Sequence, residues 1–464
     1  MSSVLTAREQ TLLDRVLLAA TDTRCLQLGA GVRRDAARTF VASFGDAPAI
    51  VVADPRTYAA AGAEVTGILR TAGIPCHEPF VFPADVWAEH SYVEMLQQAV
   101  ASIPGILVAV GSGTVNDLTK LVGHRRGQPY MLVATAASMD GYTACGASIS
   151  QRGAKSTLDC PAPRVVLADL EIIAQAPGTL NAAGYADLLA KGVAGADWIL
   201  ADAAGEEPID AAAWTMVQEF LPTWIDAPQG ISRAEPECLR RLMLGLLMSG
   251  FAMQVTGSSR PASGAEHQFS HLWDMQHHTH SGVVPLHGHK VGLGTLASLD
   301  LYELILQMDI AHLDISAAAS RWPSLEQMET RIHALLGSGA LGEQAIIETR
   351  AKYVSAASLR TQLERLHSVW PDLRTRLRRH LLPFRQTRAM LCAAGCPSEP
   401  QQIGITPERL RFSYEQAYYI RRRYTVLDLA RRLGILELLL HRLFAPAESE
   451  WSARMPSGLP SSAT

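Results

Sequence analysis

The sequence predicts an α/β N-terminal domain built on a parallel sheet, followed by an all-α C-terminal domain. Two observations lead to this prediction. Up to about residue 175, short apolar runs alternate with helix-like segments, which is typical of parallel strands covered by helices on both faces. From Pro177 onward, stretches rich in Ala, Leu, Arg and Glu carry apolar residues at spacings of three and four, as in Leu239–Val255 and Val426–Leu443.

The domain boundaries follow from these patterns and from the length of the chain. A chain of 464 residues exceeds one ordinary compact core, so we expect two domains, over residues 1–175 and 176–445. Residues 446–464 are rich in Ser, Pro and Ala and predict a disordered tail. The strands are expected at five apolar runs: Cys25–Leu28, Ala49–Ala53, Ile106–Val110, Met131–Ala134 and Val165–Ala168.

The composition argues against several classes of protein. With 48% hydrophobic and 19% charged residues and a net charge of −4, the chain is globular and lacks the basic field expected of a nucleic-acid-binding protein. Its seven scattered cysteines predict reduced thiols, and Cys392 and Cys396 are interpreted as packing residues rather than metal ligands. The N-terminus predicts an amphipathic helix rather than a secretory signal, and Leu242–Val255 is too short to span a bilayer. We therefore expect a cytoplasmic protein with no membrane partner.

A glycine-rich turn follows the predicted strand Ile106–Val110. Glycines allow close backbone approach to a phosphate, and the amides at a helix start donate to an anion, so the turn predicts a pyrophosphate site of Rossmann-like type. A plain tight turn is the alternative, because the sequence lacks the GxGxxG pattern. The predicted cofactor residues are Gly111, Gly113, Thr114, Val115, Asn116 and Asp117, together with Thr135, Ala136, Ala137 and Ser138 after the next strand.

Asp54 closes the second predicted strand. An acid at this position can accept a hydrogen bond from a ribose hydroxyl, which favours NAD over NADP, although the neighbouring Arg56 would soften rejection of a 2′-phosphate. A helix cap or turn residue beside Pro55 is an equally good interpretation.

Three histidines and one aspartate predict a metal site in the helical domain. His267 and His271 lie one helical turn apart and project from the same face, and His287 follows in a glycine-containing segment. Asp187 sits in an apolar helix, where an ionised carboxylate is costly unless it is paired or coordinated. The alternatives are an Asp187–Lys191 ion pair and ordinary surface or core histidines. His277, His278 and His280 are interpreted as loop residues.

Five segments resemble the sn-glycerol-1-phosphate dehydrogenases, in particular their bacterial AraM-like branch. The segments, which occur in the family's order, are GSGTVNDLTK (111–120), TAASMDGYT (135–143), residues 184–191, GAEHQFSHLWDM (264–275) and LHGHKVG (286–292). The family belongs to the superfamily of iron-containing alcohol dehydrogenases, glycerol dehydrogenases and dehydroquinate synthases. The C-terminal third matches only as generic helix.

The resemblance implies a dehydroquinate synthase-like fold and an enzyme that interconverts dihydroxyacetone phosphate and sn-glycerol 1-phosphate with NAD or NADP. It further implies a divalent metal on Asp187, His267 and His287, with zinc expected first and nickel or iron as alternatives. Asp140 and His271 would contact the substrate, as would Asp187. Lys155 is a candidate for binding the phosphate group of the substrate. Ala144 stands where the family usually has a serine that contacts the cofactor.

Three expectations remain open from sequence. The protein is expected to be a homo-oligomer, a dimer or larger. Rival functions on the same fold are a dehydroquinate synthase-like cyclase and a glycerol or polyol dehydrogenase, although Ser112, Thr114 and Asn116 favour a dehydrogenase over the cyclases. A non-catalytic metabolite-binding protein is a further rival, because fold alone does not establish function.

Overall fold

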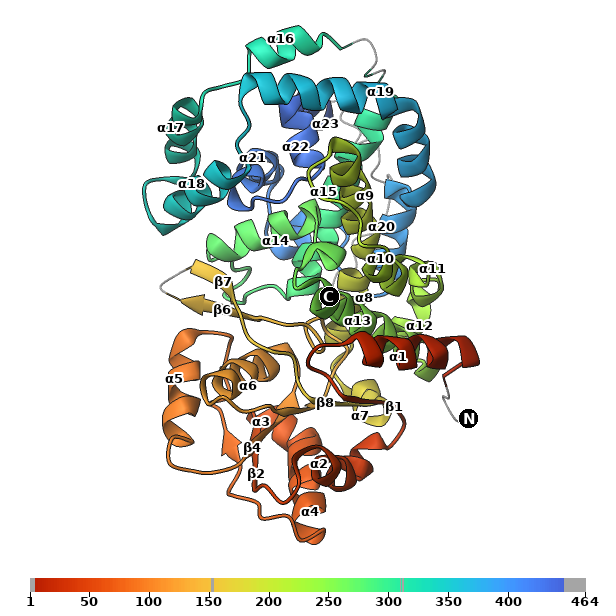
Figure 1. Ribbon diagram of the computed structural model, residues 1–464, viewed down its shortest axis with the longest axis vertical. Helices are drawn as coiled ribbons and strands as arrows, with labels where there is room; N and C mark the ends of the chain where they lie inside the picture. The colour runs from red at the N-terminus through yellow and green to blue at the C-terminus, as the bar shows by residue number, and fades with distance from the viewer. Residues whose placement is uncertain (1–4, 152–153, 309, 311–312, 446–464) are drawn as a thin grey trace, which may run out of the picture.

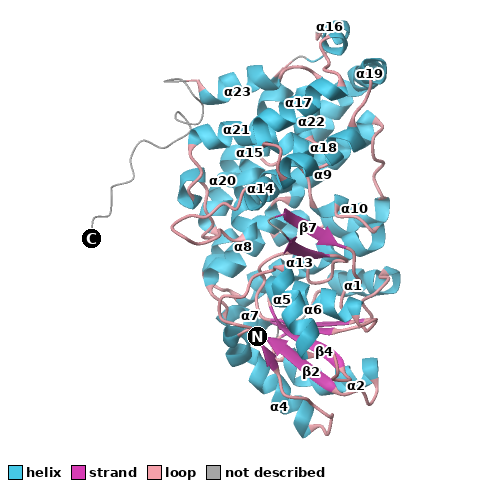
Figure 2. Ribbon diagram, turned by 90° about the vertical axis from the view of Figure 1, so that its left-hand side faces the viewer, coloured by secondary structure: helices cyan, strands magenta, loops and turns pink. Residues whose placement is uncertain are grey.

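The computed structural model describes residues 5–151, 154–308, 310 and 313–445. Figure 1 shows an α/β part at one end of the long axis and a helical part at the other. In Figure 2 the strands lie at mid-height and below, while helices alone fill the upper part. The predicted fold class is therefore confirmed; the predicted tail, residues 446–464, lies outside the described residues.

The main sheet of the described chain contains six parallel strands in the order β1-β8-β5-β4-β2-β3. Five of them coincide with the predicted apolar runs, and the two-residue β3 was not predicted. Their bounds are β1 (Cys25–Gly29), β2 (Ala49–Ala53), β3 (Phe80–Val81), β4 (Ile106–Gly111), β5 (Met131–Ala134) and β8 (Val165–Asp169).

Both faces of this sheet are apolar, which explains the continuous apolar runs. Along β2, Ile50 and Val52 pack into one hydrophobic core, whereas Ala49, Val51 and Ala53 pack into a second core on the opposite face. Because side chains alternate across a strand, a strand covered on both sides needs apolar residues at every position. Helices on both faces supply that cover.

The strand order reverses between β2 and β4. From β2 the sheet continues to β3 on one side, and from β4 it continues to β5 and β8 on the other. Open α/β sheets bind ligands outside the carboxyl ends of the strands at such a switch point. Gly111, the last residue of β4, lies there, and α6 (Gly113–Arg125) begins two residues later.

The helices of the α/β part are α1 (Ala7–Ala19), α2 (Ala36–Phe44), α3 (Pro55–Thr57), α4 (Ala63–Thr71), α5 (His90–Ala99), α6 and α7 (Leu170–Gln175). The amphipathic N-terminal helix is confirmed as α1. It packs against α13 (Pro236–Thr256) of the helical part, where Arg240 Nη1 lies 2.9 Å from Glu9 Oε2.

The remaining helices form the other part of the molecule. They are α8 (Gly178–Leu189), α9 (Lys191–Ala204), α10 (Ala211–Gln218), α11 (Leu221–Trp224), α12 (Pro228–Ser232), α14 (Ala265–Met275), α15 (His287–Gln307), α16 (Ile315–Ser320), α17 (Leu325–Leu336), α18 (Ala340–Lys352), α19 (Ala356–His380), α20 (Phe384–Ala393), α21 (Pro407–Ala417), α22 (Val426–Arg432) and α23 (Leu436–Phe444). Within the described residues, α13 alone is long and apolar enough to cross a membrane. Because 89% of its most apolar 18-residue window is buried, it is a core helix.

A β-hairpin that was not predicted lies between the two parts and contacts both of them. The antiparallel strands β6 (Ala147–Gln151) and β7 (Ala154–Leu158) contact α6 on one side and α14 on the other, and Figure 1 shows the hairpin between the two parts. Their sequences, ASISQ and AKSTL, carry too few large apolar residues to stand out as strands. Ala147 and Ile149 are nevertheless buried, at the two-residue period of a strand.

Candidate active site

Three helices approach one another closely enough for their backbones to touch. A Cβ atom at Gly288 of α15 would lie 1.8 Å from the carbonyl oxygen of Ala183 in α8. A Cβ atom at Gly294 of α15 would lie 2.3 Å from the carbonyl oxygen of Glu266 in α14. Only glycine fits at these positions, so α15 packs at minimal separation against both α8 and α14.

This packing brings together the three predicted metal ligands. One ligand atom from each of Asp187 (α8), His267 (α14) and His287 (α15) lies within 4.8 Å of the other two. The His267 and His287 ring centroids are 5.3 Å apart, and His267 Nε2 is 3.5 Å from Asp187 Oδ1. Two imidazoles and one carboxylate are a donor set that leaves coordination positions open to substrate, as in catalytic zinc sites.

The surroundings of His267 fit a metal ligand. Its Nδ1 atom lies 2.8 Å from Glu266 Oε1, so Nδ1–H donates to that carboxylate, and Nε2, 3.5 Å from Asp187 Oδ1, is the nitrogen left to bind a cation. A carboxylate behind a ligating histidine fixes the tautomer and raises the basicity of the ring. Glu266 is fully buried, which suits a residue that orients another rather than one that meets solvent.

Asp187 also forms the ion pair that sequence offered as an alternative. Lys191 Nζ lies 2.7 Å from Asp187 Oδ1 and 2.7 Å from Asp140 Oδ2, so one buried ammonium bridges two carboxylates. Burial alone would raise the pKa of Asp187, but Lys191 and the two imidazoles outweigh it and lower that pKa. The carboxylate is thus ionised, as a metal ligand requires, and the ion pair coexists with the cluster.

Asp140 lies directly beside this cluster. Its backbone amide donates to Asp187 Oδ2 at 3.0 Å, and the Ser249 hydroxyl donates to its Oδ2 at 2.9 Å. Lys120, a buried lysine of α6, holds the loop that carries Asp140 by donating to the carbonyl oxygens of Gly141, Ala144 and Gly146. Lys120 was part of the recognised motif, but its positioning role was not predicted.

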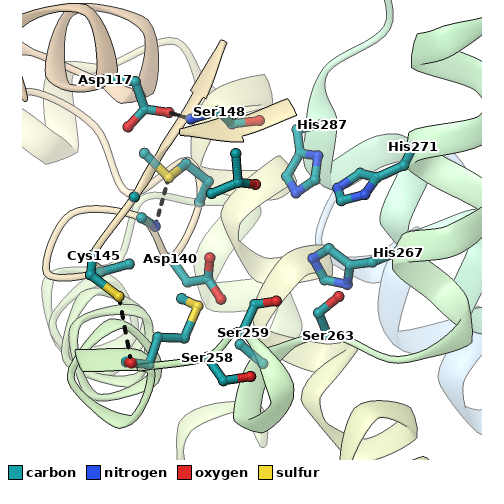
Figure 3. Close-up of a pocket in the computed structure, with 18 of the residues that line it drawn as sticks. Asp117, Asp140, Cys145, Ser148, Ser258, Ser259, Ser263, His267, His271 and His287 are labelled. Atoms are coloured by element: carbon teal, nitrogen blue, oxygen red, sulfur yellow. Dashed lines mark hydrogen bonds between the residues drawn. The ribbon is translucent and has the colours of Figure 1, made fainter. Parts of the chain in front are cut away.

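His271 lies beside the metal cluster and faces the same cavity. Its ring centroid is 5.9 Å from that of His267 and 6.2 Å from that of His287. Arg421 Nη2 lies 3.1 Å from His271 Nδ1. Because a guanidinium can only donate, Nδ1 accepts, and the neutral ring carries its proton on Nε2. Figure 3 shows the three imidazoles together on the right-hand side of the cavity, with Asp140 to their left.

This cavity, of about 1250 Å³, also reaches the glycine turn. Gly113, Thr114, Asp117 and Ser138 line it. The other predicted cofactor residues of the two loops do not line it: these are Gly111, Val115, Asn116, Thr135, Ala136 and Ala137.

Asn116, one of the predicted cofactor residues that do not line the cavity, is buried and bonded to other residues of the protein. Its Oδ1 atom accepts from the Tyr130 hydroxyl at 2.9 Å, and its amide donates to Gly141 O at 3.3 Å. Asn116 therefore supports the loop that carries Asp140. Whether it and its buried neighbours act on a dinucleotide stays a prediction.

Asp54 caps helix α3. Its Oδ1 atom accepts from the amides of Arg56 and Thr57 at 2.8 and 3.0 Å, so the capping interpretation is confirmed. Asp54 is not among the residues that line the cavity, and a ribose contact stays a prediction. Lys155 belongs to β7, but its side chain lies outside the described part of the chain.

The loop histidines and the closely spaced cysteines lie outside the cluster found among the described residues. His278 is buried and its Nε2 lies 2.6 Å from the Ile403 carbonyl oxygen, whereas His277 and His280 are exposed. Cys392 is exposed and Cys396 is buried with its Sγ directed at Ala182 O, and neither belongs to a metal cluster among the described residues.

Comparison with known proteins places the chain in two steps. Residues 27–177 match the family model described as iron-containing alcohol dehydrogenase. The fold is that of a glycerol dehydrogenase from Schizosaccharomyces pombe, at 14% identity and a TM-score of 0.57, covering 94% of this chain and 93% of that one. A maleylacetate reductase from Agrobacterium tumefaciens shares the fold at 16% identity and a TM-score of 0.55, covering 92% and 96%.

Sequence relatives define the family more narrowly. A glycerol-1-phosphate dehydrogenase [NAD(P)+] from Geobacillus stearothermophilus is 32% identical over 83% of this chain and 87% of its own length. The enzyme of that name from Halalkalibacterium halodurans is 35% identical, over 54% of this chain and 64% of its own length. The chain belongs to the glycerol-1-phosphate dehydrogenase family.

Proposed function

We propose that this protein is a metal-dependent, NAD(P)-linked dehydrogenase that interconverts dihydroxyacetone phosphate and sn-glycerol 1-phosphate. The observation that supports it most is the convergence of Asp187, His267 and His287, of which the two imidazoles line the cavity that also contains the glycine turn. Family membership adds the substrate, since oxidation of the secondary hydroxyl of glycerol 1-phosphate gives dihydroxyacetone phosphate. A glycerol dehydrogenase or a dehydroquinate synthase-like cyclase on this fold is a weaker candidate.

The residues of the chain divide the work of the reaction. Asp187, His267 and His287 would hold the divalent cation, and the start of α6 at Gly113 would hold the dinucleotide phosphates. When bound, the cation polarises the substrate oxygen as a Lewis acid and the nicotinamide exchanges hydride. We expect zinc at this site, with nickel or iron as alternatives, because imidazole and carboxylate suit all three.

His271 and Asp140 would contact the reacting oxygen and the hydroxyl groups of the substrate. With Arg421 donating to its Nδ1 atom, His271 presents an Nε2–H that can donate a hydrogen bond to the developing alkoxide, whose proton would come from water. Asp140, anchored by Lys191 and Ser249, is placed to orient substrate hydroxyls beside Asp187. In the reverse reaction the substrate hydroxyl would release its proton to water, with His271 Nε2–H stabilising the oxygen that forms.

We further propose a division near residue 175 into a dinucleotide-binding domain and a metal- and substrate-binding domain. A homodimer or larger oligomer and a cytoplasmic location complete the proposal. Gel filtration with light scattering tests the oligomeric state.

The proposed activity is tested by following the absorbance of reduced nicotinamide with purified protein and dihydroxyacetone phosphate. We expect reduction that stops after chelation and returns on addition of Zn²⁺ or Ni²⁺, because the open donor set needs its cation. Dihydroxyacetone and glycerol serve as comparison substrates. A protein that keeps full activity after its metal has been removed, or that prefers glycerol, contradicts the proposal.

A further inference from the structure

Three consecutive arginines, Arg421–Arg423, line the cavity from the C-terminal third of the chain. They lie between the short helix Tyr418–Ile420 and α22. Arg421–Arg423 lie in the C-terminal third, which resembles the family only as generic helix, and the predicted phosphate-binding cation was Lys155. An anionic substrate needs local donors, because the net charge of the chain is −4.

Arg422 is neutralised within the protein. Its Nε and Nη2 atoms lie 3.0 and 3.1 Å from the two carboxylate oxygens of Glu348, and its backbone amide donates to Glu348 Oε2 at 2.8 Å. Among the described residues, Glu348 is the only acid within ion-pair distance of Arg421–Arg423, and this bidentate pair with Arg422 neutralises it. Arg422 therefore anchors the segment and adds no net charge to the cavity.

Among the described residues, Arg421 and Arg423 form hydrogen bonds only to neutral groups, and Glu348, Glu207 and Glu266 act on them from beyond ion-pair distance. Arg421 Nη2 donates to His271 Nδ1, and Arg423 donates to the Ser263 carbonyl oxygen at 2.8 Å and to the Ser259 hydroxyl at 2.9 Å. Within the described ranges neither guanidinium forms an ion pair. Burial, followed by the charge of Arg260, lowers the pKa of Arg423 to about 10, and burial also lowers the pKa of Arg421.

Partly buried guanidinium groups that no carboxylate contacts directly are costly, and a phosphate supplies both the nearby charge and the fork-shaped acceptor that they lack. Arg421 is the better placed of the two, because it touches His271, which adjoins the metal cluster. In dihydroxyacetone phosphate the phosphate ester is attached to the carbon next to the reacting carbonyl. A phosphate site must therefore lie within one short substrate of the metal ligands.

We propose that Arg421 binds the phosphate group of the substrate and so selects phosphorylated over unphosphorylated trioses, with Arg423 as a secondary donor. This inference rests on the proposed dehydrogenase function. It assigns the phosphate to the C-terminal part of the chain, whereas Lys155 would assign it to the β6–β7 hairpin. The dinucleotide phosphates are the competing source of an anion, and the experiment separates the two.

The experiment compares Arg421→Gln with the wild type on two substrates, dihydroxyacetone phosphate and dihydroxyacetone. We expect the ratio of kcat/KM for the phosphorylated over the unphosphorylated substrate to fall about 100-fold, because a charge-assisted hydrogen bond to phosphate is lost. Arg421→Lys should recover part of the ratio, since it keeps the charge but not the fork. Arg379→Gln, an exposed arginine of α19, should leave the ratio unchanged.

Two comparisons keep the inference separate from other roles of Arg421. If Arg421 acted only on His271, both substrates would slow equally and the ratio would hold, which overturns the inference. A rise in KM for NADH with an unchanged ratio, or a loss of selectivity in Lys155→Gln but not in Arg421→Gln, also overturns it. If the wild type reduces neither substrate, the proposed function itself fails. Inhibition by inorganic phosphate, weakened in Arg421→Gln, gives a second readout.

Discussion

Replacing His267 with alanine is expected to remove tight metal binding and to lower kcat/KM for dihydroxyacetone phosphate by about 1000-fold. The ring supplies one of the three donors of the cluster, and its Nδ1 is already held by Glu266. With one donor lost, the polarisation of the substrate oxygen, which contributes several kcal/mol in such sites, goes with the cation. Metal content by mass spectrometry and steady-state kinetics measure the two effects.

His280→Ala is the matched control for this substitution. His280 is an exposed histidine in the loop before α15 and does not belong to the cluster. The His280→Ala substitution should leave metal content and kcat/KM unchanged. If the two variants behave alike, or if His267→Ala keeps its metal and its rate, the assignment of the ligands is wrong.

Replacing Gly294 with alanine is expected to destabilise the protein by about 3 kcal/mol and to weaken metal binding at the same time. The added Cβ would lie 2.3 Å from the carbonyl oxygen of Glu266 and 3.0 Å from its Cα atom, so α15 must move away from α14. The contact is with backbone, which cannot rotate aside. Because α14 and α15 carry His267 and His287, their separation also opens the ligand cluster.

Gly67→Ala provides the comparison, because Gly67 lies in α4 with no atom near its hypothetical Cβ. In an exposed helix interior this substitution should raise stability by about 1 kcal/mol. Denaturant unfolding and a metal-binding titration on both variants test the effect. Equal stability of the two variants would mean that α14 and α15 tolerate a wider spacing, and the argument from close packing would not hold.

The N-terminal sheet could be predicted because its strands carry one clear signal. Ala49–Ala53 and Ile106–Val110 are buried on both faces, so every position is apolar and the runs stand out. The β6–β7 hairpin gave no such signal, since only Ala147 and Ile149 of β6 turn inward. Its partners are α6 and α14, which are distant in sequence, so its place depends on tertiary packing.

The candidate metal site could be predicted in part from the spacing of the histidines and from the cost of a buried carboxylate, while the choice of Asp187, His267 and His287 as ligands came from the family resemblance. His267 and His271 share a helix face, and a carboxylate in the apolar helix around Asp187 needed a partner. From the local sequence, an ion pair with Lys191 and a metal site were alternative partners for Asp187. The structure contains both the Asp187–Lys191 ion pair and the cluster of Asp187, His267 and His287.

The roles of Lys120 and Arg421 could not be predicted in this way. Lys120 reaches carbonyl groups more than 20 positions away, and Arg421 meets a histidine 150 positions earlier in the chain. Sequence spacing carries no information about such contacts. For Asp54 the local sequence allowed two interpretations, a helix cap and a ribose ligand, and did not distinguish them. The structure contains the cap.

The central claim is that Asp187, His267 and His287 bind one divalent cation in the cavity that receives the substrate. The most direct measurement is an anomalous difference map from crystals of metal-loaded protein, collected on both sides of the metal's absorption edge. We expect one strong peak about 2 Å from a carboxylate oxygen of Asp187 and from one nitrogen of each imidazole. A cation bound elsewhere, with these three side chains contacting only protein, would contradict the account.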